Sequence, residues 1–177
     1  NNTALGYQAG YSTTTSPYNT FIGGIAGQNT TGSRNTFLGY NSGRDITSGS
    51  ENTILGRFVG NQGGLDIRTS DNNIVLSDGD GNPRVWCDGS GNVSIGNTSA
   101  NIITGGVDGF KYFAAGTLQL NNGSATTAEI ARYGTDGAVI KFYKGSTEVG
   151  NISLTGSSTS YNTSSDHRLK EKVVYDW

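Results

Sequence analysis

The residues best suited to chemistry in this 177-residue chain lie in one short tract near its end, residues 162–173. Before this point the chain is rich in Gly, Ser, Thr and Asn, whereas residues 166–177 are dense in charged side chains, against 15% for the whole chain. Ser165 and Lys170 lie on either side of that change. A serine hydroxyl becomes a nucleophile when a neighbouring base takes its proton, and a lysine serves as that base if burial lowers its pKa. Their spacing alone does not distinguish such a pair from chance.

Four copies of a nine-residue pattern fill the first third of the chain. The copies begin at Asn2, Asn19, Asn35 and Asn52, so their starts are 17, 16 and 17 residues apart. Each copy reads Asn-Thr-x-Leu/Ile-Gly-x-x-x-Gly, and turn-rich stretches separate the copies. A period this short has room for two short strands and two turns but not for a helical hairpin. It predicts a β-solenoid with one coil per repeat.

The repeat also predicts two apolar faces, because its third and fourth positions are both apolar. The third-position residues are Ala4, Phe21, Phe37 and Ile54, and the fourth-position residues are Leu5, Ile22, Leu38 and Leu55. Neighbours on a strand point to opposite faces of the sheet. We therefore expect one column to fill the interior of the coil and the other to need a second chain. A monomeric solenoid with one exposed apolar face is the alternative.

The remaining fixed positions of the repeat are Gly and Asn. Glycine at the fifth and ninth positions suits tight corners with a positive φ. The asparagine at the first position is suited to forming a side-chain ladder between stacked coils or to capping a turn.

Short strands continue downstream at a different rhythm. Residues 65–102 read as a meander of strands separated by Asp-Gly and Gly-Asn turns. Further strands are predicted at Thr117–Leu120, Ala128–Tyr133, Ala138–Tyr143 and Glu148–Leu154. The run Asp78–Asn82 suggests a calcium loop, but the glycine and the final acid of an EF-hand are missing, so a plain turn is favoured.

Composition excludes several classes of function. The net charge of −2 offers no basic field for nucleic acid, and no apolar run is long enough to span a membrane. One Cys and one His cannot form a Cys/His zinc site within a chain, and no cofactor or metal is predicted. Apolar side chains are few, yet nine Tyr and six Phe argue against disorder. An obligate oligomer, in which partner chains supply the missing burial, fits this balance.

The repeats over residues 1 to about 62 resemble the head repeats of trimeric bacterial adhesins and similar repeats in phage tail fibres. That resemblance implies a trimeric parallel β-roll. Residues from about 137 to 176 resemble the end of phage tail fibres and tailspikes that carry an endosialidase-type intramolecular chaperone. The residues that carry this second resemblance are Phe142–Gly145, Val149–Ser153, Tyr161–Asp166 and Arg168–Glu171.

In that family the chaperone trimerises the shaft and then cuts itself off at a Ser-Asp junction. The resemblance therefore implies cleavage between Ser165 and Asp166, with Ser165 as nucleophile and Lys170 as general base. Lys172 stands where the family commonly has Asn. Whether water or the Ser165 of another subunit acts is left open. Too few residues follow Ser165 to form the chaperone, so we expect this segment to be inactive by itself.

We therefore predict an all-β, elongated homotrimeric fibre, in which an N-terminal parallel β-roll or β-solenoid precedes an intertwined β-prism or triple β-helix shaft. The expected domains are a β-roll (1–64), a meander module (65–102), a distal β-shaft (103–165) and the start of the truncated chaperone (166–177).

The predicted function is that of a structural and receptor-attachment segment of a phage tail fibre, located outside the cell in the virion and not itself an enzyme. Its expected partners are two further copies of the chain, a bacterial surface glycan or protein receptor, and other virion tail proteins. No nucleic acid and no membrane insertion is expected. The alternatives are a polysaccharide-degrading tailspike and a trimeric cell-surface adhesin.

Overall fold

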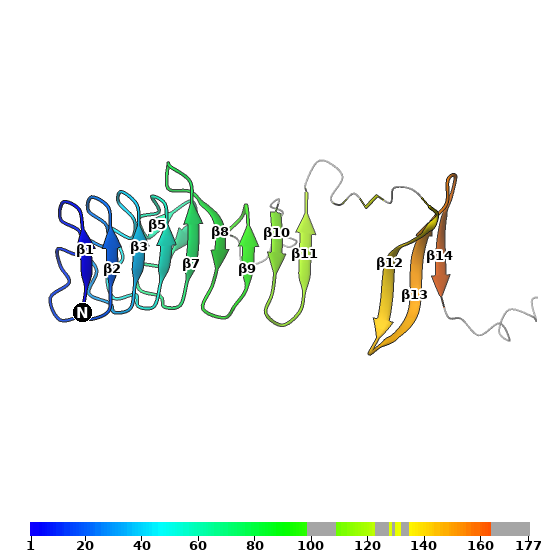
Figure 1. Cartoon of the computed structure of the whole chain (residues 1–177), viewed down its shortest axis with the longest axis horizontal. Coiled ribbons are helices and arrows are strands. Elements are labelled where there is room, and N and C mark those ends of the chain that lie inside the picture. The colour runs from blue at the N-terminus through cyan, green and yellow to red at the C-terminus, as the bar shows by residue number, and fades with distance from the viewer. Residues whose placement is uncertain (99–108, 123–127, 129, 132–134, 164–177) are drawn as a thin grey trace, which may run out of the picture. The chain divides into compact units, whose positions relative to one another are not determined.

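The computed structural model describes residues 1–98, 109–122, 128, 130–131 and 135–163. The chain divides into two compact units, Asn1–Thr127 and Ala128–Trp177. Every regular element among the described residues is a β-strand (Figure 1). The prediction of an all-β chain with an N-terminal β-solenoid is confirmed.

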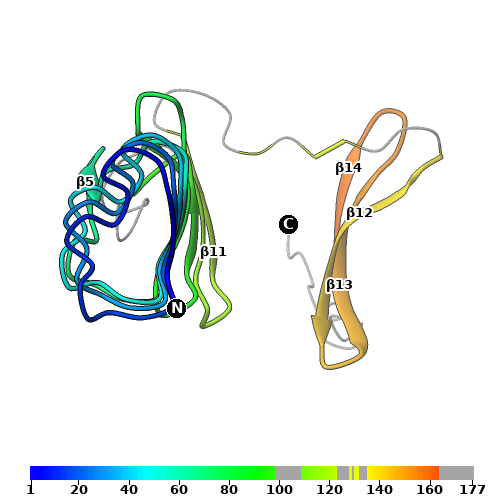
Figure 2. The same ribbon diagram turned by 60° about the vertical axis from the view of Figure 1, so that its left-hand side comes forward.

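Each repeat of the first unit contributes one short strand, and these strands stack in parallel. They are β1 (Thr3–Leu5), β2 (Thr20–Ile22), β3 (Thr36–Leu38) and β4 (Thr53–Leu55). A fifth parallel strand, β7 (Ile74–Ser77), pairs with β4 beyond the four repeats. Between them the chain forms a hairpin of β5 (Asn61–Gln62) and β6 (Leu65–Asp66), and β5 lies on the side of the coil away from the stacked strands (Figure 2).

After β7 the same sheet continues in antiparallel order. The added strands are β8 (Pro83–Cys87), β9 (Val93–Ile95), β10 (Gly109–Tyr112) and β11 (Leu118–Asn121). Nine strands therefore form one sheet among the described residues, parallel from β1 to β7 and a meander from β7 to β11. The predicted strand at Thr117–Leu120 is confirmed with its bounds shifted by one residue.

The third position of the repeat fills the interior of the solenoid. Phe21, Phe37, Ile54 and Val75 are at most 1% exposed and lie in one row across β2, β3, β4 and β7. The rings of Phe21 and Phe37 stack with their centroids 5.3 Å apart. Further buried apolar side chains complete the core together with this row, and they are Ala26, Ile46, Phe58, Leu65 and Ile67. Burying such a side chain contributes roughly 1.5–3 kcal/mol.

The first-position asparagines form the ladder that the sequence suggested. The side-chain Oδ1 of Asn19 accepts the backbone N–H of Asn35 at 2.9 Å, and Asn35 Oδ1 accepts the N–H of Asn52 at 3.0 Å. The same contact joins Asn2 to Asn19 and Asn52 to Asn73. Each side-chain amide also donates across its own coil, as Asn35 does to the carbonyl oxygen of Gly49 at 3.0 Å. These buried polar groups therefore fix the register of the coils.

The residue before each ladder asparagine has a left-handed backbone, which the sequence did not suggest. Tyr18, Arg34, Glu51 and Asn72 have φ between 59° and 66°. A non-glycine residue in this region costs roughly 1–2 kcal/mol. Because the buried asparagines hold the following amide in place, the ladder offsets that strain.

Glycine at the fifth position allows the coils to stack closely. Gly23 and Gly39 have φ values of 133° and 136°. A Cβ atom on Gly23 would overlap the carbonyl oxygen of Gly39, and one on Gly39 would overlap that of Gly56. Both the conformation and the space therefore require glycine, as the repeat predicted.

The second unit is a three-stranded antiparallel sheet. Its strands are β12 (Gly137–Lys144), β13 (Thr147–Leu154) and β14 (Thr159–Thr163), in that order across the sheet. The first two were predicted, whereas β14 was not. The predicted strand Ala128–Tyr133 is wrong at its described residues Ala128, Ile130 and Ala131, because no described strand lies beside them to accept their hydrogen bonds.

The ladder makes a direct prediction for stability. Asn35→Ala removes the acceptor of the Asn52 N–H and the donor to Gly49, which leaves two buried backbone groups without partners. Each unsatisfied group costs roughly 1–3 kcal/mol, so we expect a loss of about 3 kcal/mol in the free energy of unfolding, measured with urea. Asn61→Ala, at an exposed asparagine of β5, is the control. Equal unfolding midpoints for the two variants would contradict the role of the ladder.

Candidate functional site

The fourth position of the repeat lies on the outer side of the sheet. Leu5, Leu38 and Leu55 are 66%, 46% and 38% exposed, in contrast to the buried third-position residues Phe21, Phe37 and Ile54. One apolar column thus fills the coil and the other does not, as the repeat predicted. The outer column is the start of a longer feature.

Strand register extends this column across all nine strands of the sheet. We call it the outer row, and its residues are Leu5, Ile22, Leu38, Leu55, Leu76, Val85, Ile95, Phe110 and Leu120. Directly paired residues share one face of a sheet, so nine large apolar side chains lie side by side. Monomeric proteins rarely expose a continuous apolar patch of this kind.

A second apolar row lies beside the outer row from β7 onward. Its members occupy alternate positions on the same strands and are Ile74, Cys87, Val93, Tyr112 and Leu118. On β1 to β4 the equivalent position is threonine in each repeat. The two rows together form what we call the outer apolar face. The sequence analysis missed the second row, although the alternation of apolar and polar residues in Val93–Ile95 and Leu118–Leu120 carries its signal.

The inner side of the sheet becomes more polar beyond β7. Beyond Val75 the inward row continues as Trp86, Ser94, Lys111 and Gln119. The Nζ of Lys111 lies 5.3 Å from the centroid of the Trp86 ring, and Trp86 Nε1 donates to Asn73 Oδ1 at 3.2 Å. From β8 to β11 the apolar residues therefore concentrate on the outer side of the sheet. In this part of the sheet, most of the apolar side chains that could form a hydrophobic core lie on the outer apolar face.

The second unit is also two-faced. Ile140, Ile152 and Tyr161 lie opposite one another, with Phe142 and Leu154 on the same side. Phe142 is 51% and Tyr161 77% exposed, so this apolar side is also open.

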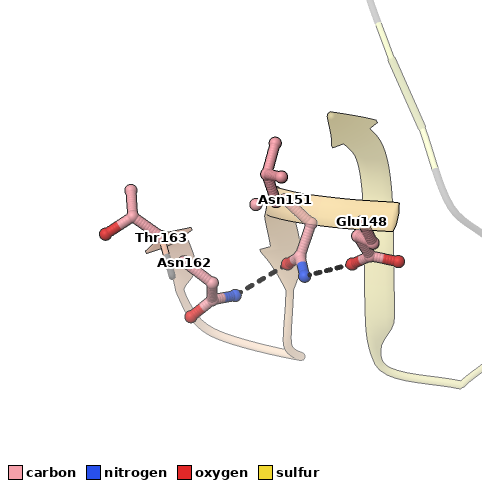
Figure 3. A pocket seen from close by; sticks show the side chains of 6 residues that line it. Glu148, Asn151, Asn162 and Thr163 are labelled. Carbon is pink, nitrogen blue, oxygen red and sulfur yellow. Dashed lines mark hydrogen bonds between the residues drawn. The ribbon is translucent and has the colours of Figure 1, made fainter. Parts of the chain in front are cut away.

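The opposite side of the second unit carries a hydrogen-bonded polar network. Glu148 accepts from Lys141 at 2.9 Å. Glu148 also accepts from Asn151 at 2.8 Å, and Asn162 donates to Asn151 at 2.8 Å (Figure 3). Lys141 and Asn151 lower the pKa of Glu148, in that order of effect. Glu148, Asn151 and Asn162, with Thr163, also line a shallow pocket of about 250 Å³. Glu148, Asn151 and Asn162 are therefore hydrogen-bonded to one another within this pocket.

The predicted cleavage residues Ser165, Asp166 and Lys170 lie outside the described residues. The described part of the second unit ends at Thr163, the last residue of β14, which pairs with Gly150 of β13. The strand that leads to the junction is therefore held at the edge of this sheet.

The suspected calcium loop is one of two turns of identical design. Asp78–Asn82 and Asp88–Asn92 both read Asp-Gly-x-Gly-Asn. In the first, Asp78 Oδ1 accepts the backbone N–H groups of Asp80 and Asn82 at 3.0 and 2.8 Å. In the second, Asp88 Oδ1 accepts those of Ser90 and Asn92. These carboxylates serve the turns, and no group of three metal-binding side chains occurs within the described ranges.

A second pocket, of about 380 Å³, lies beside the first of these turns. It is lined by Gly63, Asn82, Pro83, Arg84, Gly96, Asn97 and Thr98. The guanidinium group of Arg84, which lines this pocket, forms an ion pair with Asp78. Thr98 Oγ1 donates to the carbonyl oxygen of Gly63 at 3.0 Å, which joins two sides of the pocket.

No family model, curated protein or solved structure matches this chain. In the parts of the chain that the structure describes, no helix is long and apolar enough to cross a membrane. The outer apolar face is the strongest candidate for a functional surface on this geometry.

The turn chemistry predicts a specific dependence on pH. The N–H of Asn82, with help from its side chain and from Arg84, holds the pKa of Asp78 far below its ordinary value. The stabilising effect of this carboxylate is complete above its unfolded-state pKa near 3.9 and is lost as the pH falls through the lower folded-state value.

We expect Asp78→Asn to lower the urea midpoint by a constant amount between pH 7 and about 5, with the difference shrinking below about pH 4. Asp80→Asn, in the same turn, is the matched control and should leave the midpoint unchanged. A difference between Asp78→Asn and wild type that persisted undiminished at pH 2 would contradict this role.

Proposed function

We propose that this chain is a structural and receptor-attachment segment of a phage tail fibre, and that it works as a homotrimer. The observation that carries the proposal is the outer apolar face, whose outer row runs unbroken across nine strands. A second apolar surface of the same length would cover this face along its whole extent. Another copy of the same chain has such a surface. The repeats that resemble trimeric fibre proteins support three copies.

In this arrangement the two parts of the first unit would assemble differently. The solenoid has its own core in the row of Phe21, Phe37, Ile54 and Val75. From β8 onward the larger core would form between chains, where the three outer faces meet as an intertwined prism or triple β-helix. A rod of this kind places three identical surfaces at a fixed spacing, so weak contacts with a bacterial surface reinforce one another.

The receptor in this proposal is a bacterial cell-surface glycan or protein, and the rod is joined to other tail proteins of the virion. The chain itself is not an enzyme in this proposal. Four aspartates that a polysaccharide-degrading site could use already bind other groups: Asp78 and Asp88 hold turns, Asp66 pairs with Arg68, and Asp71 accepts the N–H of Ser50.

The attachment role predicts that assembly and cell binding are lost together. Leu55→Lys and Ile95→Lys each place a charge in the outer row, where burial without a partner is costly. We expect both variants to be monomers and to lose at least about tenfold in retention on receptive bacteria, because avidity is lost. Thr69→Lys, at an exposed turn residue, is the control. The measurement is flow cytometry of labelled protein on a panel of capsulated and uncapsulated bacteria.

Two results would contradict the attachment role. One is a wild-type protein that no strain in the panel retains. The other is the release of oligosaccharide from capsule during the incubation, which would favour the tailspike alternative.

The resemblance at the chain's end supports a second part of the proposal: in a longer parent, a C-terminal chaperone assists trimerisation and then cuts itself off beside Ser165. In a chain that includes the chaperone, we expect Ser165→Ala and Lys170→Ala to leave the product uncut, whereas Ser157→Ala and Lys172→Asn are cut normally. Intact mass spectrometry reads the result. Cleavage of the Ser165→Ala chain at wild-type rate would remove Ser165 as the nucleophile.

A further inference from the structure

The pocket beside the first Asp-Gly-x-Gly-Asn turn is built from three separate segments of the first unit, and we call it the loop pocket. Its walls are Gly63 at the tip of the β5–β6 hairpin, Asn82–Arg84 around the start of β8, and Gly96–Thr98 directly after β9. Its volume of about 380 Å³ lies in the range of small-molecule sites, roughly 300–1,000 Å³. The loop pocket therefore has room for a small ligand.

Hydrogen bonds between these segments hold the walls in place. Gln62 Nε2, from the hairpin, donates to the carbonyl oxygen of Asp80 in the turn at 2.6 Å. Thr98 Oγ1 donates to the carbonyl oxygen of Gly63 at 3.0 Å, and the N–H of Gly96 donates to a carbonyl oxygen of β8 at 2.9 Å. Because the walls are fixed before a ligand arrives, little ordering entropy is lost on binding.

Glycine lets the hairpin tip approach the other walls closely. A Cβ atom on Gly63 would lie 2.9 Å from Cδ of Pro83, and one on Gly64 would lie 3.2 Å from Oγ1 of Thr98. Both glycines also have a positive φ, of 61° and 82°. On the third wall, a Cβ atom on Gly96 would meet no atom within 4 Å, so the pocket is open at that point.

The side chains of the loop pocket leave one donor and one acceptor for a ligand. Nε and Nη2 of Arg84 both donate to Asp78 Oδ2, and Nδ2 of Asn82 lies 3.2 Å from the same oxygen. Nη1 of Arg84 and Oδ1 of Asn82 make no hydrogen bond with the described residues. Asp78 also neutralises the charge of Arg84. The pocket thus offers a donor and an acceptor without a net positive charge.

The loop pocket lies on the other side of the sheet from the outer apolar face. Val85 of β8 belongs to the outer row, and its neighbour Arg84 points the other way because side chains alternate along a strand. The strand that leads into the hairpin tip, β5, lies on the side of the coil away from the stacked strands (Figure 2). The pocket therefore stays accessible when other chains cover the outer apolar face.

We propose that the loop pocket binds one sugar residue of a neutral glycan. Neighbouring sugar hydroxyls both donate and accept, so Nη1 of Arg84 donates to one hydroxyl oxygen and Oδ1 of Asn82 accepts from the next. Pro83 supplies an apolar part of the wall. An acidic sugar is disfavoured, because Arg84 is already neutralised and Asp80 adds a carboxylate to the same turn. This inference rests on the proposed attachment role and names its ligand class and its residues.

Biolayer interferometry of the native protein on immobilised dextran, mannan, galactan and alginate tests the inference. We expect retention on at least one of the three neutral polymers and weaker retention on the acidic alginate. Retention on the neutral polymer should change little between about 0.05 and about 0.5 M NaCl, because no charge of the ligand is paired.

Arg84→Gln removes the Nη1 donor and should lose about tenfold in affinity for the neutral polymer. The matched control is Arg68→Gln. Arg68 also donates to an aspartate, Asp66, through Nε and Nη2, but does not line the loop pocket. This control should bind within about twofold of wild type.

Gly96→Asn separates binding from folding. It puts a side chain on the pocket wall at a φ of 72°, which asparagine tolerates better than most residues. We expect it to keep the urea midpoint and molar mass of the wild type and to bind several-fold more weakly. The inference is overturned if no neutral polymer retains the wild type, if Arg84→Gln and Arg68→Gln bind equally, or if alginate is bound more tightly than every neutral polymer.

Retention of wild type and Gly96→Asn on the bacterial panel distinguishes this inference from the attachment role. Equal retention of the two on every strain would leave attachment standing and remove the loop pocket as its site. If no strain retains either protein, the attachment role fails as well.

Discussion

The structure depends on a constraint that acts within three residues: two adjacent apolar side chains on one short strand must point to opposite faces. In each coil the third-position side chain enters the interior, so the fourth-position side chain is left outside. Because the register is kept from strand to strand, the outward side chains of successive strands line up in a continuous outer row of nine residues. Assembly, as we propose it, is the consequence of that row.

The register itself depends on groups that tolerate little change. The buried asparagines connect each coil to the next through Oδ1 and to their own coil through Nδ2, and Gly23 and Gly39 let neighbouring backbones touch. An error in either would shift the apolar columns relative to one another. The polar ladder therefore determines where the apolar surfaces lie, although it contributes little apolar area of its own.

Much of the first unit could be predicted because the same residue types occupy the same positions in four repeats. The third and fourth positions gave the two faces, and Asn35 and Gly39 belong to positions whose roles follow from their chemistry. Pairing between strands of different sequence does not follow from the repeat. The second apolar row depends on the register of β7 to β11, and β14 depends on its pairing with β13. Ala128–Tyr133 has a strand-like composition but no described neighbour, so composition misled there. Ser165 and Lys170 are still predictions.

The molar mass of the native protein tests the central claim that the outer apolar face is covered by copies of this chain. Size-exclusion chromatography with light scattering should give a mass of three chains at micromolar concentration, with one chain for Ile95→Lys. A wild-type protein that is a stable, soluble monomer with its outer row open to solvent would contradict the account.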